Sequence, residues 1–154
     1  MRKWVGWAAS LVVAAGLVAV GSTAASAAPV RPAACTSTGT VEITSLAFNP
    51  LAVAPGGSST ATLKAQNCTG QTISATATWI AQFQGSGGGL PAGCPVIDPI
   101  ARPATFAPHG TVTQSTGYLV PSGCTATSLH LTVRISAGGS VLATGTANLT
   151  IIQV

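Results

Sequence analysis

Charged side chains are scarce in this sequence, and the few present are scattered. Asp, Glu, Lys and Arg together make up 5% of the 154 residues, and the formal net charge is +4 at pH 7. Two of the cations, Arg2 and Lys3, stand at the start of the chain, and the others are spread thinly after them. Proteins that bind nucleic acids or membrane surfaces carry clustered basic residues. We therefore expect no nucleic-acid partner and no membrane contact for the folded part of the chain.

Residues that carry catalysis are equally few. The chain has two acids, Glu42 and Asp98, and two histidines, His109 and His130. No serine stands in a G-x-S-x-G motif, and a glycosidase needs two carboxylates about 5 to 9 Å apart, for which the chain offers a single pair. His109 falls in a Pro-His-Gly turn and His130 on the outward face of an expected strand, where a solvated histidine is the commoner explanation. The sequence thus predicts neither an enzyme nor a cofactor-binding protein.

The N-terminus has the three parts of a cleavable export signal of the bacterial type. Arg2 and Lys3 precede an apolar stretch, residues 4–20, and the small-residue cleavage box Ala25-Ser26-Ala27 follows. A retained membrane anchor is the alternative, but the apolar stretch is barely long enough for a bilayer and lacks a cationic flank on its far side. We expect residues 1–27 to be a signal peptide and the protein to be secreted.

The rest of the chain is long enough for one domain and too short for two. We divide it into an N-terminal segment, residues 28–39, and a single domain, residues 40–154. Four cysteines in an exported chain predict two disulfide bonds. Zinc binding is the alternative, but the spacings contain no C-x-x-C pair and neither histidine stands at ligand spacing, so we expect no metal. The four cysteines are Cys35, Cys68, Cys94 and Cys124.

Apolar and polar residues alternate in most of the domain, and this period of two predicts strands. The clearest case runs from Ile73 to Phe83, with Trp79 on the apolar face. A change of phase at Thr44-Ser45 indicates a β-bulge in the first strand, which Leu51 and Val53 would continue. Further strands are expected at 60–66, 111–120, 129–135 and 141–152, with a tight hairpin turn at 137–140 between the last two. About seven strands without a helical stretch predict an all-β, immunoglobulin-like antiparallel β-sandwich.

Residues 84–103 interrupt the pattern. They contain a run of glycines and then Pro91, Pro95, Pro99 and Pro103. Glycine and proline both disfavour strands. The sequence therefore predicts a long loop here, with at most a short strand near 104–107.

Two short segments resemble a known family. Ala54-Pro55-Gly56-Gly57, an alternating strand and then Asn67-Cys68-Thr69-Gly70 are similar to the opening of bacterial CARDB-like and related immunoglobulin-like modules. The resemblance covers about twenty residues. It implies an extracellular adhesive or spacer module, of a kind often repeated and appended to larger proteins, and it identifies no site residue.

The expected strand order selects one of the three possible disulfide pairings. Cys35 precedes the first strand and Cys68 lies in the turn after the second, so alternating strands place both at one end of the sandwich. The same count places Cys94 and Cys124 at the other end. The remaining pairings would join opposite ends of strands roughly 25 to 30 Å long, whereas a bridge needs Cα atoms within about 7 Å. We predict Cys35–Cys68 and Cys94–Cys124.

Two binding hypotheses follow from the remaining features. A structural or adhesive module that touches cell-wall or extracellular polysaccharide would stack an exposed aromatic on sugar faces, and the candidates are Trp79, Tyr118 and the three phenylalanines. Trp79 shares a face with apolar residues and is more simply explained as a core residue. The alternative is a secreted inhibitor or ligand-binding protein that presents residues 84–99, including Leu90, to a protein partner.

The export signal makes a direct prediction. The mature protein begins at Ala28, because small residues occupy both recognition positions of the peptidase before it. Intact-mass measurement on culture supernatant checks this. A full-length species in the membrane fraction would contradict it.

Overall fold

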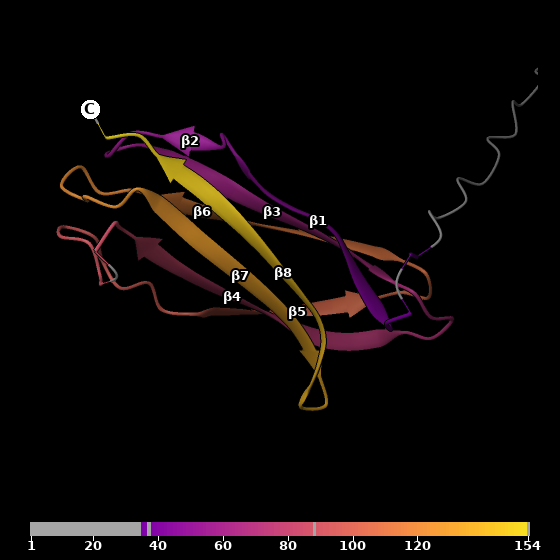
Figure 1. Cartoon of the computed structure of the whole chain (residues 1–154). Coiled ribbons are helices and arrows are strands. Elements are labelled where there is room, and N and C mark those ends of the chain that lie inside the picture. The colour runs from indigo at the N-terminus through magenta and orange to yellow at the C-terminus, as the bar shows by residue number, and fades with distance from the viewer. Residues whose placement is uncertain (1–34, 37, 88, 154) are drawn as a thin grey trace, which may run out of the picture. The chain divides into compact units, whose positions relative to one another are not determined.

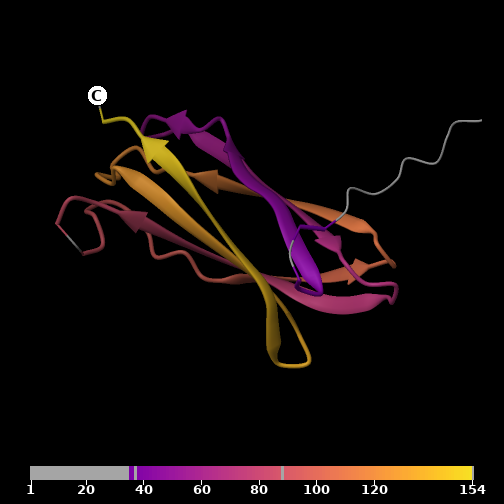
Figure 2. The same ribbon diagram turned by 45° about the vertical axis from the view of Figure 1, so that its right-hand side comes forward.

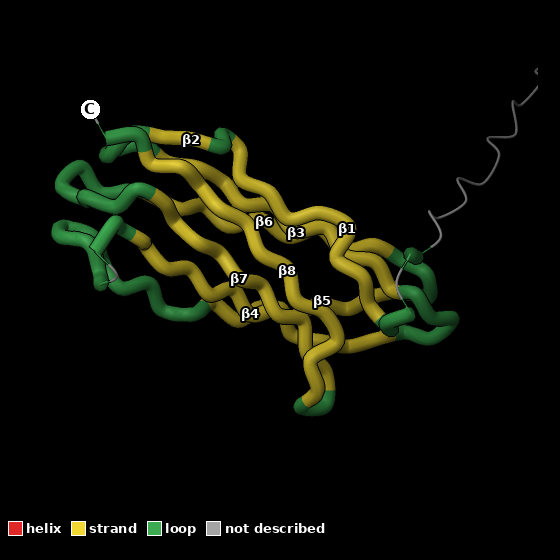
Figure 3. Tube along the Cα trace, in the orientation of Figure 1, coloured by secondary structure: helices red, strands yellow, loops and turns green. Residues whose placement is uncertain are grey.

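The computed structural model describes residues 35–36, 38–87 and 89–153, and this part of the chain is all-β (Figure 1). The expected signal peptide, residues 1–27, lies outside the described residues. Within them there is no helix long and apolar enough to cross a membrane. Figure 3 shows strands joined by loops. The strands are β1 (Val41–Asn49), β2 (Ala52–Val53), β3 (Ser58–Asn67), β4 (Ile73–Gln84), β5 (Ile100–Phe106), β6 (Thr111–Leu119), β7 (Ser128–Ala137) and β8 (Ser140–Ile151).

The eight strands form two sheets that pack face to face (Figures 1 and 2). One has the order β1-β3-β6 and the other β2-β8-β7-β4-β5. The pairings are antiparallel except that of β2 with β8. Buried apolar side chains of both sheets make one core between them. Because each sheet buries only one face, alternation along the strands is the pattern this fold requires.

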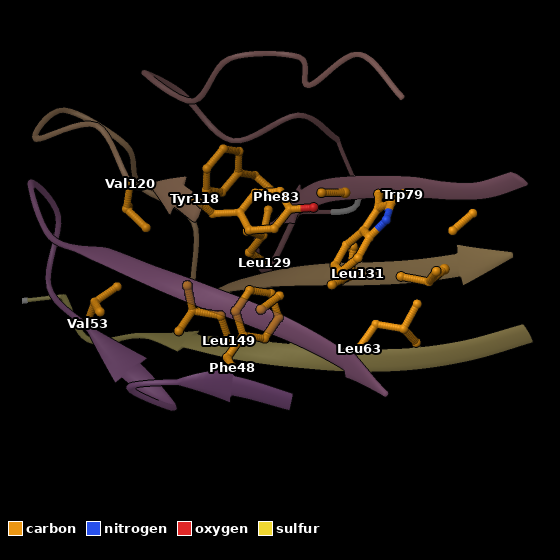
Figure 4. Packing of buried hydrophobic residues seen from close by; sticks show 14 of the residues in the cluster. Phe48, Val53, Leu63, Trp79, Phe83, Tyr118, Val120, Leu129, Leu131 and Leu149 are labelled. Carbon is orange, nitrogen blue, oxygen red and sulfur yellow. The ribbon is translucent and has the colours of Figure 1, made fainter. Parts of the chain in front are cut away.

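β4 illustrates how the sequence produces this arrangement. Its residues alternate between the core and the outside, and Trp79 and Phe83 are 1% and 4% exposed. Figure 4 shows both side chains packed with Leu129 and Leu131 of the neighbouring β7. Threonine and glutamine occupy much of the opposite face, where β-branched Thr suits a strand surface in contact with water.

Two local features predicted from the sequence are confirmed. The pairing of β1 with β3 shifts register between Ile43 and Ser45, where the change of phase predicts a bulge. The hairpin between β7 and β8 turns on Gly138 and Gly139, whose φ angles are 57° and 81°. Two consecutive positive φ values define the tight turn that matches strand twist, and glycine adopts them without strain.

Two expectations about strands are wrong. Residues 52–53 do not continue β1; they form β2, which pairs with Thr150 and Ile151 in the other sheet. The fifth strand is also longer than the short segment near 104–107, because it begins at Ile100 and includes Pro103. β5 is the edge strand of its sheet. Proline is tolerated at an edge because its missing N–H can face away from the ladder.

The two predicted disulfide pairings are confirmed. Cys35–Cys68 joins the residue stretch before β1 to the β3–β4 turn, and Cys94–Cys124 joins the β4–β5 loop to the β6–β7 loop. No cysteine in the chain's described part is free. The bridges span sequence separations of 33 and 30 residues, so each restricts the unfolded chain substantially.

Removal of the second bridge is expected to destabilise the domain. Replacing Cys94 and Cys124 together by serine should lower the free energy of unfolding by about 3 to 4 kcal/mol on loop-entropy grounds. That is a large share of the free energy of unfolding of a typical domain, roughly 5 to 15 kcal/mol. Urea unfolding of the double variant measures it, with Thr144→Ser on the exposed face of β8 as a control. An unchanged midpoint would contradict the prediction.

Candidate functional site

The aromatic side chains considered for sugar stacking, the three phenylalanines among them, lie in the core (Figure 4). Trp79 is 1% exposed and Tyr118 is 6% exposed. Tyr118 projects inward from β6 and packs edge-on against Phe48, with ring centroids 5.8 Å apart. Burial raises the pKa of Tyr118 to about 12, and the positive charge of Arg102 acts in the opposite direction. The hypothesis that either ring is a surface stacking platform is therefore wrong.

Arg102 has a structural role at the seam between the sheets. Its guanidinium lies 5.9 Å from the ring centroid of Trp79, and Nη1 donates a hydrogen bond of 2.6 Å to the carbonyl of Ser115. Gln114 Nε2 donates to the carbonyl of Pro103 at 2.9 Å. These contacts connect β5 with β6, the edge strands on one side of the two sheets. They explain why a cation faces inward on β5.

The histidines make contacts that hold strands and turns. His130 Nδ1 lies 2.8 Å from Asn148 Oδ1 on the adjacent β8, which makes a cross-strand pair. His109 has a φ of 54° in the turn between β5 and β6, and its backbone N–H donates to the carbonyl of Thr69. Each histidine thus has a local structural function.

One group of potential metal ligands occurs among the residues that the structure describes. It consists of Cys35, Glu42 and Cys68. Both sulfur atoms are joined in the disulfide bond, and the Glu42 carboxylate accepts a hydrogen bond of 2.8 Å from the backbone N–H of Thr36. A disulfide sulfur has no thiolate to offer a metal. The cluster is explained by the bridge and its neighbouring strand.

A groove of about 610 Å³ lies between β4 and the loop of residues 85–99 that follows it. Figure 3 shows this loop leaving the end of β4 and running back toward the start of β5. Its apolar wall includes Leu90 and Val96, which are 57% and 77% exposed, and the partly buried Ile97. Leu90, a candidate from the sequence, therefore lies at the groove, together with two side chains that the sequence analysis missed.

The other wall of the groove is the edge of a strand. Consecutive residues from Ile80 to Gln84 line it, both those that face the core and those that face outward. β5 pairs with β4 only from Ile73 to Trp79, whereas β7 pairs with β4 as far as Gln84. Within the described residues, this segment of β4 thus has a strand on one side only. Such an edge presents backbone N–H and C=O groups to whatever enters.

Residues 92–94 of the loop are fixed to the β6–β7 loop. Cys94 is bridged to Cys124, and the backbone N–H of Thr125 donates to the carbonyl of Ala92 at 2.9 Å. Gly93, with a φ of 70°, approaches so closely that a Cβ on it would stand 1.9 Å from the carbonyl oxygen of Gly123. Only glycine fits there. The groove wall is therefore held in position by covalent and backbone contacts.

Asp98 stands at the rim of this groove. Its side chain is exposed, and its neighbours Ile97 and Pro99 both line the groove. Asp98 is one of two acids in the whole chain. In the part of the chain that the structure describes, no hydrogen bond or ion pair engages its carboxylate. The site thus combines apolar side chains, an unpaired strand edge and one negative charge.

Comparisons with known proteins show similarity of fold alone. No family model matches the chain, and no curated protein matches it. Among solved structures, it is similar to an alkylpurine DNA glycosylase AlkC from Pseudomonas fluorescens, bound to DNA containing an abasic site analog. The TM-score is 0.54 and the identity 10%, over 75% of this chain and 31% of the glycosylase. At that identity the match supports the two-sheet fold and no shared activity.

Two further structures match more weakly. A putative beta-galactosidase from Bacteroides fragilis gives a TM-score of 0.47 at 15% identity, over 72% of this chain and 16% of that one. The ASH/PapD-like domain of human CEP192 gives a TM-score of 0.44 at 14% identity, over 84% of this chain and 97% of that domain. The chain spans less than a third of the glycosylase and of the galactosidase. The function must therefore be argued from the groove itself.

The close approach of Gly93 predicts a specific sensitivity. Gly93→Ala should lower the free energy of unfolding by about 1 to 3 kcal/mol, because alanine is strained at positive φ and its Cβ meets the Gly123 carbonyl. The matched control is Gly123→Ala, where an added Cβ meets nothing within 4 Å. Urea unfolding measures the free energy of unfolding of both variants and tests the prediction. Equal stabilities would show that the loop is not anchored at this point.

Proposed function

We propose that this protein is a non-catalytic, secreted binding module of immunoglobulin-like fold that takes a protein partner in the groove between β4 and residues 85–99. The observation that carries the proposal is the groove itself, with exposed apolar side chains on a loop fixed by a disulfide bond. Eight strands in two sheets support the fold, and two disulfide bonds are compatible with an oxidising, extracellular compartment.

Exposed apolar side chains support binding at this place. Leu90 and Val96 are two of the six large apolar residues exposed in the described part of the chain, and both lie at the groove. Grouped apolar exposure is typical of interaction sites, whereas single exposed residues are ordinary. Loops on rigid β-scaffolds often carry binding functions. A loop fixed in advance also loses less conformational entropy when a partner binds.

The polysaccharide hypothesis is less well supported. It depends on an exposed aromatic side chain, and all the candidates, Trp79, Tyr118 and the three phenylalanines, are buried. A purely structural or spacer role, which the resemblance to CARDB-like modules implies, needs no groove. That role stays a prediction, and the experiment below would favour it if the wild type retained none of the proteins, peptides or polysaccharides.

Paired variants test the proposed function. The groove variant replaces Leu90 and Val96 by serine. The control replaces Leu119 and Val141 by serine; both are also more than half exposed but lie outside the groove. The wild type and both variants are incubated with a panel of secreted proteases, a displayed random-peptide library, and insoluble cellulose and chitin.

We expect the wild type and the control to retain protein or peptide ligands. The groove variant should bind them at least about tenfold more weakly, because truncation of central apolar contacts typically costs more than 1 kcal/mol each. Retention on polysaccharide that all three proteins share would contradict the proposal. So would protein binding that the groove substitutions leave unchanged.

A further inference from the structure

We propose that the groove holds its partner as an extended peptide strand, which pairs with the edge of β4 from Ile80 to Gln84 and places a lysine or arginine opposite Asp98. The inference rests on the proposed function and adds the chemistry of the occupant. The added strand would lie on the same side of β4 as β5 does, and would continue the five-stranded sheet past the start of β5.

The pairing registers define the open edge. Along β4, the pairing with β5 stops at Trp79, which lies opposite Ile100, the first residue of β5. The pairing with β7 on the other side continues to Gln84. At about 3.3 Å per residue, the open segment is roughly 15 Å long, enough for a peptide of about five residues. Strand addition uses such an edge, because its backbone hydrogen bonds supply affinity without a particular sequence.

The loop beside this edge does not pair with it as a strand. Pro91, Pro95 and Pro99 have no backbone N–H and therefore cannot donate to a ladder. One backbone donor between them is used elsewhere, because the N–H of Cys94 donates to the carbonyl of Pro91. The Cys94–Cys124 bridge holds the loop in this position. The loop is thus a fixed wall that leaves the edge of β4 unpaired.

Side chains on the two walls indicate the sequence of the peptide. In a strand, alternate side chains face opposite sides, so one set would meet Leu90, Val96 and Ile97 of the loop and should be apolar. Asp98 lies at the rim with no partner in the chain's described part. A basic residue near it would be favoured by charge complementarity. Neutral polysaccharides such as cellulose and chitin have neither peptide groups at the spacing of a strand nor a cationic side chain.

The first experiment selects peptides on the purified protein from a displayed library of random dodecapeptides. We expect apolar or β-branched residues at alternate positions and a lysine or arginine at one fixed position. A synthetic version of a selected peptide is then N-methylated at one backbone nitrogen at a time. Because only every second N–H of an added strand faces β4, methylation should weaken binding more than tenfold at alternate positions and less than threefold between them.

The second experiment examines the protein. Bound peptide should slow amide exchange in residues 80–84 and leave β1 unchanged. Asp98→Asn should lower the affinity for a lysine-containing peptide about twofold to fivefold at low salt. The effect should vanish in high salt, as for a solvent-exposed charge pair. Glu42→Gln, which removes the other acid from the opposite sheet, is the control and should leave affinity unchanged.

The outcomes separate this inference from the proposed function. If N-methylation shows no alternation while the Leu90 and Val96 substitutions abolish binding, strand addition is overturned and the groove remains a binding site. If selected peptides bind the groove variant as well as the wild type, both proposals fail. Concentration-dependent dimers in light scattering that the selected peptide does not dissociate would identify a second copy as the occupant and overturn the peptide.

Discussion

Burial of the inward face of β4 is the constraint on which the rest of the structure depends. Trp79 and Phe83 are buried in the core, and β7 pairs with one edge of the strand from Thr76 to its end at Gln84. Burial of large side chains of this kind contributes about 1.5 to 3 kcal/mol each. The strand is therefore fixed as far as Gln84, even though its partner on the other side ends at Trp79. The open edge is a consequence of a stable strand with an incomplete neighbour.

The sequence predicts those parts of the fold that depend on local patterns. The alternation in β4, the bulge in β1 and the two-glycine turn are encoded by residues within a few positions of one another. The disulfide pairing follows because it needs only the order and direction of the strands. β2 and the start of β5 are missed, since a two-residue strand has no periodicity and Pro103 weakens the signal of an edge strand that tertiary pairing stabilises.

The site is harder to predict because it arises from pairing between distant segments. Alternation cannot show that β7 extends further along β4 than β5 does, and that difference produces the groove. Tyr118 is missed as a core residue because polar Gln114 and Thr116 occupy the same inward face of β6. A signal for the loop was present. Val96-Ile97 is an apolar pair between Pro95 and Pro99, and Leu90 is the other large apolar residue in a segment rich in glycine and proline.

Two edges of the five-stranded sheet differ in how they are covered: the outer edge of β5 and the end of β4. Natural proteins protect edge strands with prolines, charges or covering loops, since a bare edge pairs with other chains. β5 carries Pro103, and Arg102 and Gln114 connect it to β6, so that edge is closed. The end of β4 has a loop beside it that forms no strand, contains several prolines and is held at the wall of a groove by a disulfide bond. Under the proposed function, this arrangement protects one edge and leaves the next one open only to a chain narrow enough to enter the groove.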